Sequence, residues 1–133
     1  HFSNPEMVAR YLDGPRRFVP GLDALLQMTV QLLSEAAPDE ARVLVLGAGG
    51  GSELHAMAAA KPRWRFVGVD PSGEMLDIAR HTARDYLDRI ELVEGLIEDA
   101  PTEPFDAATC LLTLHFLAPT ERQRTLRQLH QRL

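Results

Sequence analysis

The fold is decided by one stretch of sequence, Arg42-Val43-Leu44-Val45-Leu46-Gly47-Ala48-Gly49-Gly50-Gly51-Ser52-Glu53. Its residues 43–46 are all apolar and partly β-branched, which is typical of a strand buried on both faces of a parallel sheet. Four glycines then fall within five positions, and a mostly apolar run that fits a helix starts at Ser52. Because glycine has no Cβ, the backbone can turn sharply there and a ligand can approach the main chain closely. The unpaired N–H groups at the start of the helix favour an anionic ligand group.

A second apolar segment, residues 66–69, ends in Asp70. An acid about 20 residues beyond a glycine turn is typical of proteins that bind a ribose hydroxyl. We therefore expect a nucleotide-type ligand over the turn. Two plainer alternatives stay open: the glycines serve packing alone, and Asp70 is only the N-cap of the next helix.

The overall composition limits the classes of protein that this chain can represent. Its 133 residues suffice for one domain with a modest core, and we expect a single domain over 1–133. The net charge of −5 gives no support for binding to a polyanion, so DNA is not an expected partner. The single cysteine, Cys110, excludes an intrachain disulfide, and a cytoplasmic location is the default. We expect no membrane segment and assign no metal site.

The remaining pattern alternates strands and helices. A helical N-terminal cap is expected over 1–40, with helices over 7–12 and 22–37. Strands are predicted over 43–46, 65–69, 90–93 and 105–112, and helices over 52–60, from about 72, and over 121–133 with Thr120 as its cap. This alternation predicts an α/β fold, a doubly wound parallel sheet between two helical layers, over residues 41–133. We expect the arginines near the two ends to lie on solvated helix faces, namely Arg16, Arg17, Arg122, Arg124, Arg127 and Arg132.

Four segments taken in order resemble the class I S-adenosylmethionine-dependent methyltransferases. Residues 43–51 resemble the first motif of that family and residues 69–76 the second. Residues 93–101 resemble the loop that flanks adenine, and residues 105–110 the fourth strand. Within the family, residues 17–21 and 113–117 are similar to the branch of the carboxy-S-adenosylmethionine synthases of tRNA wobble-uridine modification.

The resemblance implies a Rossmann-like fold with S-adenosyl-L-methionine as the cofactor and transfer of its methyl group to a small-molecule or RNA acceptor. Asp70 would bind the ribose, and Leu96 and Ile97 would sandwich adenine with Met75. Residues at the end of the fourth strand would line the methionine side. The full set of implied cofactor-binding residues is Gly47, Ala48, Gly49, Gly51, Asp70, Pro71, Ser72, Met75, Leu96, Ile97, Glu98, Cys110 and Leu111. The one candidate for a general base is His115, whose alternative is a structural or surface histidine.

The chain departs from the family pattern at three places. The family usually has an acid at the position of Val45 and commonly one at the position of Leu96. Three alternatives stay open for the second position: Glu98 substitutes for the acid, a main-chain carbonyl does so, or the adenine contact is purely apolar. The chain ends at Leu133 with strands in the order 3-2-1-4, the first part of the family order 3-2-1-4-5-7-6. Its fourth strand would be an open edge, which proteins avoid. Either the chain is a fragment, or another chain, such as a second copy in a homodimer, covers that edge.

Two other functions remain open. A NAD(P)-dependent oxidoreductase shares the strand, glycine turn and acid, although its fingerprint needs Gly or Ala where Ser52 stands. A non-catalytic module that binds S-adenosylmethionine or a nucleotide would account for the departures at Val45 and Leu96.

Overall fold

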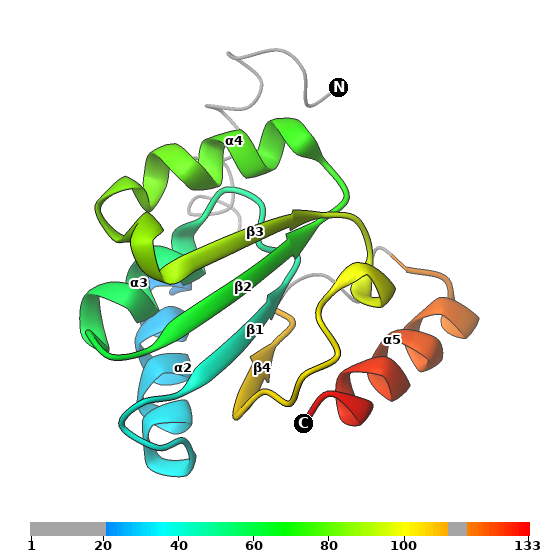
Figure 1. The fold of residues 1–133 in the computed structure, drawn as a ribbon, viewed down its shortest axis with the longest axis horizontal. Coiled ribbons are helices and arrows are strands. Elements are labelled where there is room, and N and C mark those ends of the chain that lie inside the picture. The colour runs from blue at the N-terminus through cyan, green and yellow to red at the C-terminus, as the bar shows by residue number, and fades with distance from the viewer. Residues whose placement is uncertain (1–20, 112–116) are drawn as a thin grey trace.

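The computed structural model describes residues 21–111 and 117–133 (Figure 1). The helix expected over 7–12 lies outside this described part. In chain order the elements are α2 (Leu22–Ala36), β1 (Arg42–Leu46), α3 (Ser52–Ala60), β2 (Arg65–Asp70), α4 (Gly73–Thr82), the 3-10 helix η1 (Arg84–Arg89), β3 (Ile90–Glu94), the 3-10 helix η2 (Ile97–Asp99), β4 (Ala107–Thr109) and α5 (Pro119–Gln131).

The four strands form one parallel sheet in the order β3-β2-β1-β4, as predicted. β1 lies inside the sheet, between β2 and β4, and its residues 43–46 are all buried. This position explains the unbroken apolar run, because a strand covered on both faces has no side for polar residues. The carboxyl ends of β1, β2 and β4 meet at one edge, which is the edge that the glycine turn occupies.

Side chains that alternate along β1 divide the core into two clusters. Val43 and Val45 pack with residues of α3 and with Trp64, and α2 lies against that side. Leu44 and Leu46 pack on the opposite side with residues of η2 and α5. Helices therefore lie on both sides of the sheet, in the predicted α/β/α arrangement (Figure 1).

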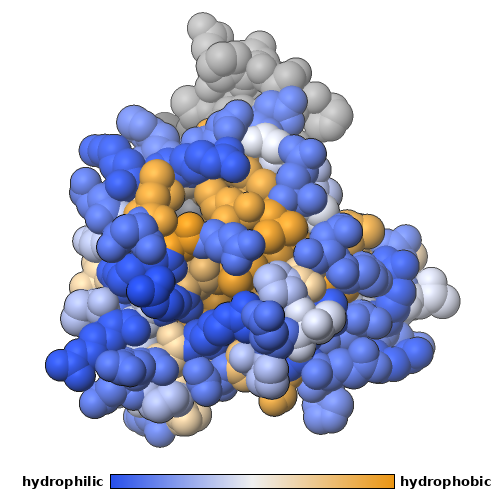
Figure 2. Space-filling view, in the orientation of Figure 1, coloured by the Kyte–Doolittle hydropathy of each residue, from blue (hydrophilic) through white to orange (hydrophobic). Residues whose placement is uncertain are grey.

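The residues that the structure describes cover the second side of the sheet incompletely. Figure 2 shows apolar residues gathered in the middle of this face, with hydrophilic residues around them. Val93, Ala108 and Cys110 pack at the border of the second cluster and are only partly buried.

The fourth strand is shorter than predicted. Of the described residues in this region, only 107–109 join the sheet, so the expectation of a strand over 105–112 was wrong for residues 105, 106, 110 and 111, and residue 112 lies outside the described part. The N–H of Phe105 donates to the carbonyl of Arg132 at 2.7 Å instead of to a strand. The Asp106 carboxylate accepts a hydrogen bond from the N–H of Arg42 at 2.8 Å, which ties the entry of β4 to the start of β1.

The last helix also differs from expectation. It begins at Pro119, with Ala118 as its N-cap residue, so Thr120 lies inside the helix and does not cap it. Proline suits the first turn of a helix because an N–H at that position has no acceptor within the helix, so proline loses no hydrogen bond there.

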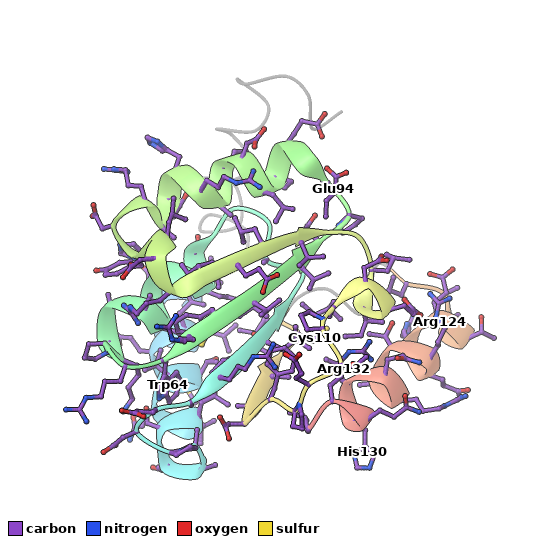
Figure 3. The ribbon with its side chains drawn as sticks, viewed as in Figure 1. Trp64, Glu94, Cys110, Arg124, His130 and Arg132 are labelled. Carbon is purple, nitrogen blue, oxygen red and sulfur yellow. The ribbon has the colours of Figure 1, made fainter. Side chains whose placement is uncertain are left out.

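Arg132, expected on a solvated face, is only 5% exposed. Its guanidinium donates to the carbonyls of Ala100 and Pro101 at 3.3 and 3.2 Å. These hydrogen bonds satisfy two backbone acceptors in the loop after η2. Arg124 forms an ion pair with Glu98 of η2 at 2.9 Å, and both arginines connect α5 to η2 (Figure 3).

Candidate functional site

The glycine turn between β1 and α3 contains backbone φ angles that are strained for residues other than glycine. Gly47, Gly50 and Gly51 have φ angles of 74°, 86° and 78°, in the left-handed region that favours glycine. The N–H groups of Gly47 and Ala48 donate to the carbonyl of Val69 at 2.8 and 3.0 Å, so the turn folds back over the end of β2. A Cβ on Gly51 would stand 2.8 Å from the Cα of Ala79 in α4. Packing therefore accounts for part of this glycine content.

Asp70 closes the turn from the end of β2. Its Oδ2 accepts a hydrogen bond from the N–H of Gly49 at 2.9 Å, and its Oδ1 accepts one from the N–H of Ser72 at 2.9 Å. The N-cap of α4 is Ser72, whose hydroxyl accepts from the N–H of Met75 at 3.2 Å. Asp70 is therefore not the N-cap residue. A carboxylate offers about four acceptor directions, and Asp70 is only partly buried, so acceptor capacity remains on its exposed side.

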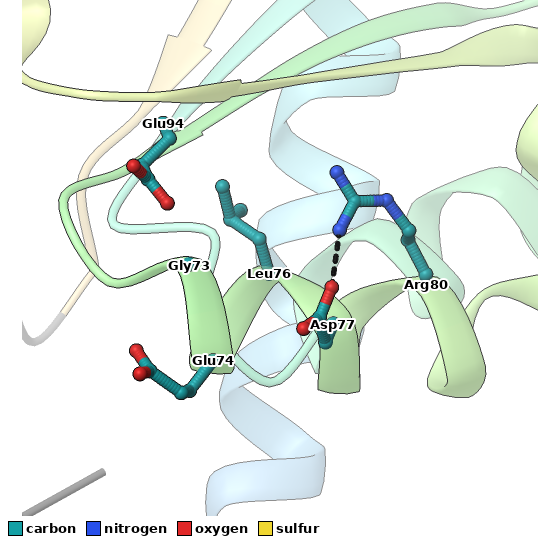
Figure 4. Close-up of a pocket in the computed structure, with 6 residues that line it drawn as sticks. All are labelled: Gly73, Glu74, Leu76, Asp77, Arg80 and Glu94. Carbon is teal, nitrogen blue, oxygen red and sulfur yellow. Dashed lines mark hydrogen bonds and ion pairs between the residues drawn. The ribbon is translucent and has the colours of Figure 1, made fainter. Parts of the chain in front are cut away.

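A pocket lies beside the start of α4, at the end of β3 (Figure 4). It is lined by Gly73, Glu74, Leu76, Asp77, Arg80 and Glu94. A side chain on Gly73 would collide with the Glu94 carboxylate, so the absence of a Cβ there keeps this carboxylate close to α4. Arg80 is paired with Asp77 at 2.6 Å. Glu74 and Glu94 thus leave the pocket with an acidic character next to Asp70.

The residues implied for adenine binding differ in accessibility. Leu96 is 47% exposed, whereas Ile97 and Met75 are 2% and 4% exposed and belong to the interior. The Leu96 N–H donates to the Asp99 carboxylate at 2.8 Å, which fixes the loop after β3. Of the three apolar residues, Leu96 is the one that offers most of its side chain to a ligand. Glu98 is held in its ion pair with Arg124.

The side chain of Glu53, which the sequence did not single out, reaches the end of β4. Glu53, in the first turn of α3, accepts a hydrogen bond from the hydroxyl of Thr109 at 3.0 Å. Burial raises the pKa of Glu53 from 4.5 to about 7, and the hydrogen bond from Thr109 opposes this rise. Burial, with a smaller contribution from the Glu53 charge, raises the pKa of Cys110 to about 11. The thiol therefore stays protonated at neutral pH, and it is unsuited to act as a nucleophile.

The other candidates fall in different places. Leu111 is partly buried after β4, and Pro71 is exposed beside Asp70. His115 lies outside the described residues. One signal in the sequence could have indicated Glu53: it is the only acid in an otherwise largely apolar helix that directly follows the glycine turn.

Within residues 21–111 and 117–133, no group of three or more His, Cys, Asp or Glu side chains is arranged to hold a metal ion. In the same ranges, every helix is too short or too polar to cross a bilayer.

Known proteins with similar sequences and structures point in one direction. A carboxy-S-adenosyl-L-methionine synthase of Campylobacter lari is 28% identical over 117 residues, which cover 88% of this chain and 50% of the relative. The enzyme of the same name from Chromohalobacter salexigens is 32% identical and is matched over 96% of this chain and 49% of its own length. The chain thus spans about half the length of these curated relatives.

Among solved structures, SAM-bound CalS10, an amino pentose methyltransferase from Micromonospora echinaspora, superimposes with a TM-score of 0.75. It is 26% identical, and the match covers 92% of this chain and 51% of that one. Residues 43–133 match the family described as a methyltransferase domain, and they include the glycine turn, Asp70 and Glu53. The chain therefore belongs to the methyltransferase domain family.

Proposed function

We propose that this chain binds S-adenosyl-L-methionine over the glycine turn and belongs to an enzyme that transfers its methyl group to a small-molecule or RNA acceptor. The observation that carries the proposal is the Asp70 carboxylate, which fixes the turn through Gly49 and keeps acceptor capacity on its exposed side. Membership of the methyltransferase domain family supports the choice of cofactor.

The residues around the turn fit this cofactor. Asp70 would accept hydrogen bonds from the ribose hydroxyls with the lone pairs that Gly49 and Ser72 leave unused. A Cβ on Gly49 would meet the Asp70 Oδ2 at 2.7 Å, so this position has room for backbone only. Leu96 would contact adenine with its exposed side chain.

The protein's own contribution to the chemistry is positioning. The cofactor, when bound, supplies a methyl group that is already activated as part of a sulfonium. The glycine turn and Asp70 would fix the direction of the methyl group, and the acceptor must be held in line with it with water excluded. The high pKa of Cys110 keeps its thiol neutral, so it would not compete with the acceptor for the methyl group.

The relatives named above suggest a second candidate within the same cofactor chemistry. The chain is up to 32% identical to carboxy-S-adenosyl-L-methionine synthases over nearly its whole length, and that identity exceeds its identity to the amino pentose methyltransferase. In this case a carboxyl group from a second substrate would replace one hydrogen of the S-methyl group, with loss of that hydrogen as a proton, and no methylated acceptor would form.

Two measurements test the proposal. Isothermal titration calorimetry with S-adenosylhomocysteine and, separately, with NAD should show binding of the first alone. Binding of NAD alone would instead support the oxidoreductase. Incubation with methyl-labelled S-adenosylmethionine and a mixture of small molecules and RNA as acceptors, followed by mass spectrometry, should find the label on one of these acceptors. In a parallel incubation with carboxylic acids as carboxyl donors, label retained in a carboxylated nucleoside product would support the synthase. Tight binding without turnover in either incubation would support the non-catalytic module.

A further inference from the structure

Glu53 is a carboxyl group placed between two elements at the ligand edge of the sheet. It starts from the first turn of α3, directly after the glycine turn, and reaches Thr109, the last residue of β4, across 56 positions of sequence. Thr109 is 5% exposed, so the hydrogen bond between them is largely withdrawn from water. Glu53 itself is only partly buried, so part of the residue remains accessible.

This carboxyl group has no cation to balance it among the described residues. The ion pairs between described residues involve Glu103, Asp77 and Glu98, and none involves Glu53. A partly buried carboxylate without a cationic partner is costly, because removal from water disfavours the charged form. The hydroxyl of Thr109 relieves only part of this cost.

The titratable groups nearby cannot supply the missing positive charge. Cys110, which follows Thr109, has its pKa raised by burial and, to a smaller extent, by the charge of Glu53, and a thiol carries no positive charge in either form. His55, on the same helix, packs edge-on against Tyr86 of η1, with 5.6 Å between ring centroids.

We propose that Glu53, oriented by Thr109, binds the α-ammonium group of the methionine moiety of S-adenosylmethionine. This inference rests on the proposed function, because it assumes that the cofactor lies over the glycine turn. The amino-acid end of the cofactor would then reach the edge where β1 and β4 end. β1 ends in apolar, buried residues and supplies no carboxylate there, so the acid comes from α3.

The proposed contact makes binding depend on pH. The ammonium group favours the ionised form of Glu53, so a carboxyl group with a pKa of about 7 loses its proton when the ligand binds. Affinity should therefore rise about tenfold between pH 6 and pH 8, as the ionised fraction of the free carboxyl group rises.

The test compares two ligands by calorimetry. S-adenosylhomocysteine carries the amino-acid group, whereas 5′-methylthioadenosine shares the adenosine and the thioether sulfur but lacks that group. Glu53→Gln should weaken binding of S-adenosylhomocysteine by about ten- to a hundredfold, the range for a lost hydrogen bond to a charged group. It should leave 5′-methylthioadenosine unaffected and abolish the pH dependence.

A second pair of variants separates the ammonium contact from a general effect on the turn. Thr109→Val removes the hydrogen bond that lowers the pKa of Glu53, so the midpoint of the pH dependence should move to higher pH. Thr109→Ser keeps the hydroxyl and should keep the midpoint. Calorimetry in two buffers of different ionisation enthalpy should detect the proton released by the wild-type chain and none from Glu53→Gln.

Three results would overturn the inference. Equal affinity of wild type and Glu53→Gln for S-adenosylhomocysteine, with the same pH dependence, would show that Glu53 does not contact the amino group. An equal loss for both ligands would show that Glu53 acts through the shape of the turn. Failure of the wild-type chain to bind either ligand would refute the proposed function itself, and this inference with it.

Discussion

The N–H of Gly49 donates to the carboxylate of Asp70 at 2.9 Å, although 21 positions of sequence separate the two residues. This hydrogen bond joins the turn after β1 to the end of β2, the two places where the sequence predicted a ligand. The same carboxylate also accepts from Ser72 and so fixes the entry to α4. A ligand bound at Asp70 would therefore meet a turn that is already ordered, which lowers the entropy lost on binding.

Replacement of Asp70 by Asn should weaken the binding of both test ligands, because both contain a ribose. We expect affinity for S-adenosylhomocysteine and for 5′-methylthioadenosine to fall about ten- to a hundredfold by calorimetry. Stability should also fall by about 1–3 kcal/mol, measured by urea unfolding, because the N–H of Gly49 loses a charged acceptor.

A matched control lies at the opposite edge of the sheet. Asp106 likewise accepts a backbone hydrogen bond, from the N–H of Arg42 at 2.8 Å. Asp106→Asn should lower stability by a similar amount and leave both affinities unchanged. If Asp70→Asn behaved like Asp106→Asn, Asp70 would serve the turn alone.

A methyl group added at Gly49 should disturb Asp70 directly. The new Cβ would stand 2.7 Å from the Asp70 Oδ2 and 2.8 Å from the Cβ of Met75, closer than real Cβ contacts. We expect Gly49→Ala to lower the free energy of unfolding by about 1–3 kcal/mol, as overpacking does, and to lower the affinity for S-adenosylhomocysteine. In a double-mutant cycle with Asp70→Asn, the loss of stability and of affinity in the double variant should be smaller than the sum of the losses in the two single variants. The reason is that both changes act on one contact. Additive losses would contradict this coupling.

Leu96 provides a test of the adenine contact that does not affect the fold. Its side chain is 47% exposed, so Leu96→Ala should change stability by less than about 0.5 kcal/mol. Loss of the apolar contact with adenine should cost about 1–2 kcal/mol of binding free energy. The affinities for S-adenosylhomocysteine and for 5′-methylthioadenosine should therefore fall equally, by about five- to thirtyfold. Leu126→Ala, at a leucine that is 52% exposed on α5, is the control and should change neither affinity. Unchanged binding to Leu96→Ala would exclude this loop from the adenine site.

The central part of the fold could be predicted because its signals are local. The strands β1, β2 and β3 lie within one residue of their expected bounds, since each is a short, mostly apolar segment with a charged or turn-forming boundary. The start of α4 was also predictable, because Ser72 is a good N-cap residue and follows a proline. Family resemblance then supplied the order of the strands, which no local pattern contains.

The features that could not be predicted depend on contacts between remote residues. β4 begins two residues later than expected, after Phe105 has bonded to Arg132 and Asp106 to Arg42, and neither partner is visible from the sequence around β4. Arg132 was expected in solvent because an isolated arginine in a polar helix usually lies there. The pairing of Glu53 with Thr109 has the same origin, because it spans α3 and β4. Such pairings are properties of the assembled fold.

Glu53 should also make the stability of the chain depend on pH, even without a ligand. In the folded chain its pKa is raised from 4.5 to about 7, so the unfolded chain loses this proton at lower pH than the folded chain does. Between about pH 4.5 and 7 the folded state binds more protons, and the free energy of unfolding therefore falls as the pH rises. The full loss, reached above pH 7, is at most about 3 kcal/mol.

Glu53→Gln removes the titrating group and should remove this loss. Urea unfolding should find wild type and variant similar in stability near pH 5, and the variant more stable by about 1–3 kcal/mol at pH 8. Glu40→Gln, at an exposed glutamate before β1, removes one negative charge elsewhere and should keep the wild-type dependence on pH. A Glu53→Gln variant that is more stable at pH 8 yet binds S-adenosylhomocysteine more weakly would show that the carboxylate is kept for its ligand, at a cost in stability. A variant with the same difference from wild type at both pH values would show that Glu53 does not retain its proton in the folded chain.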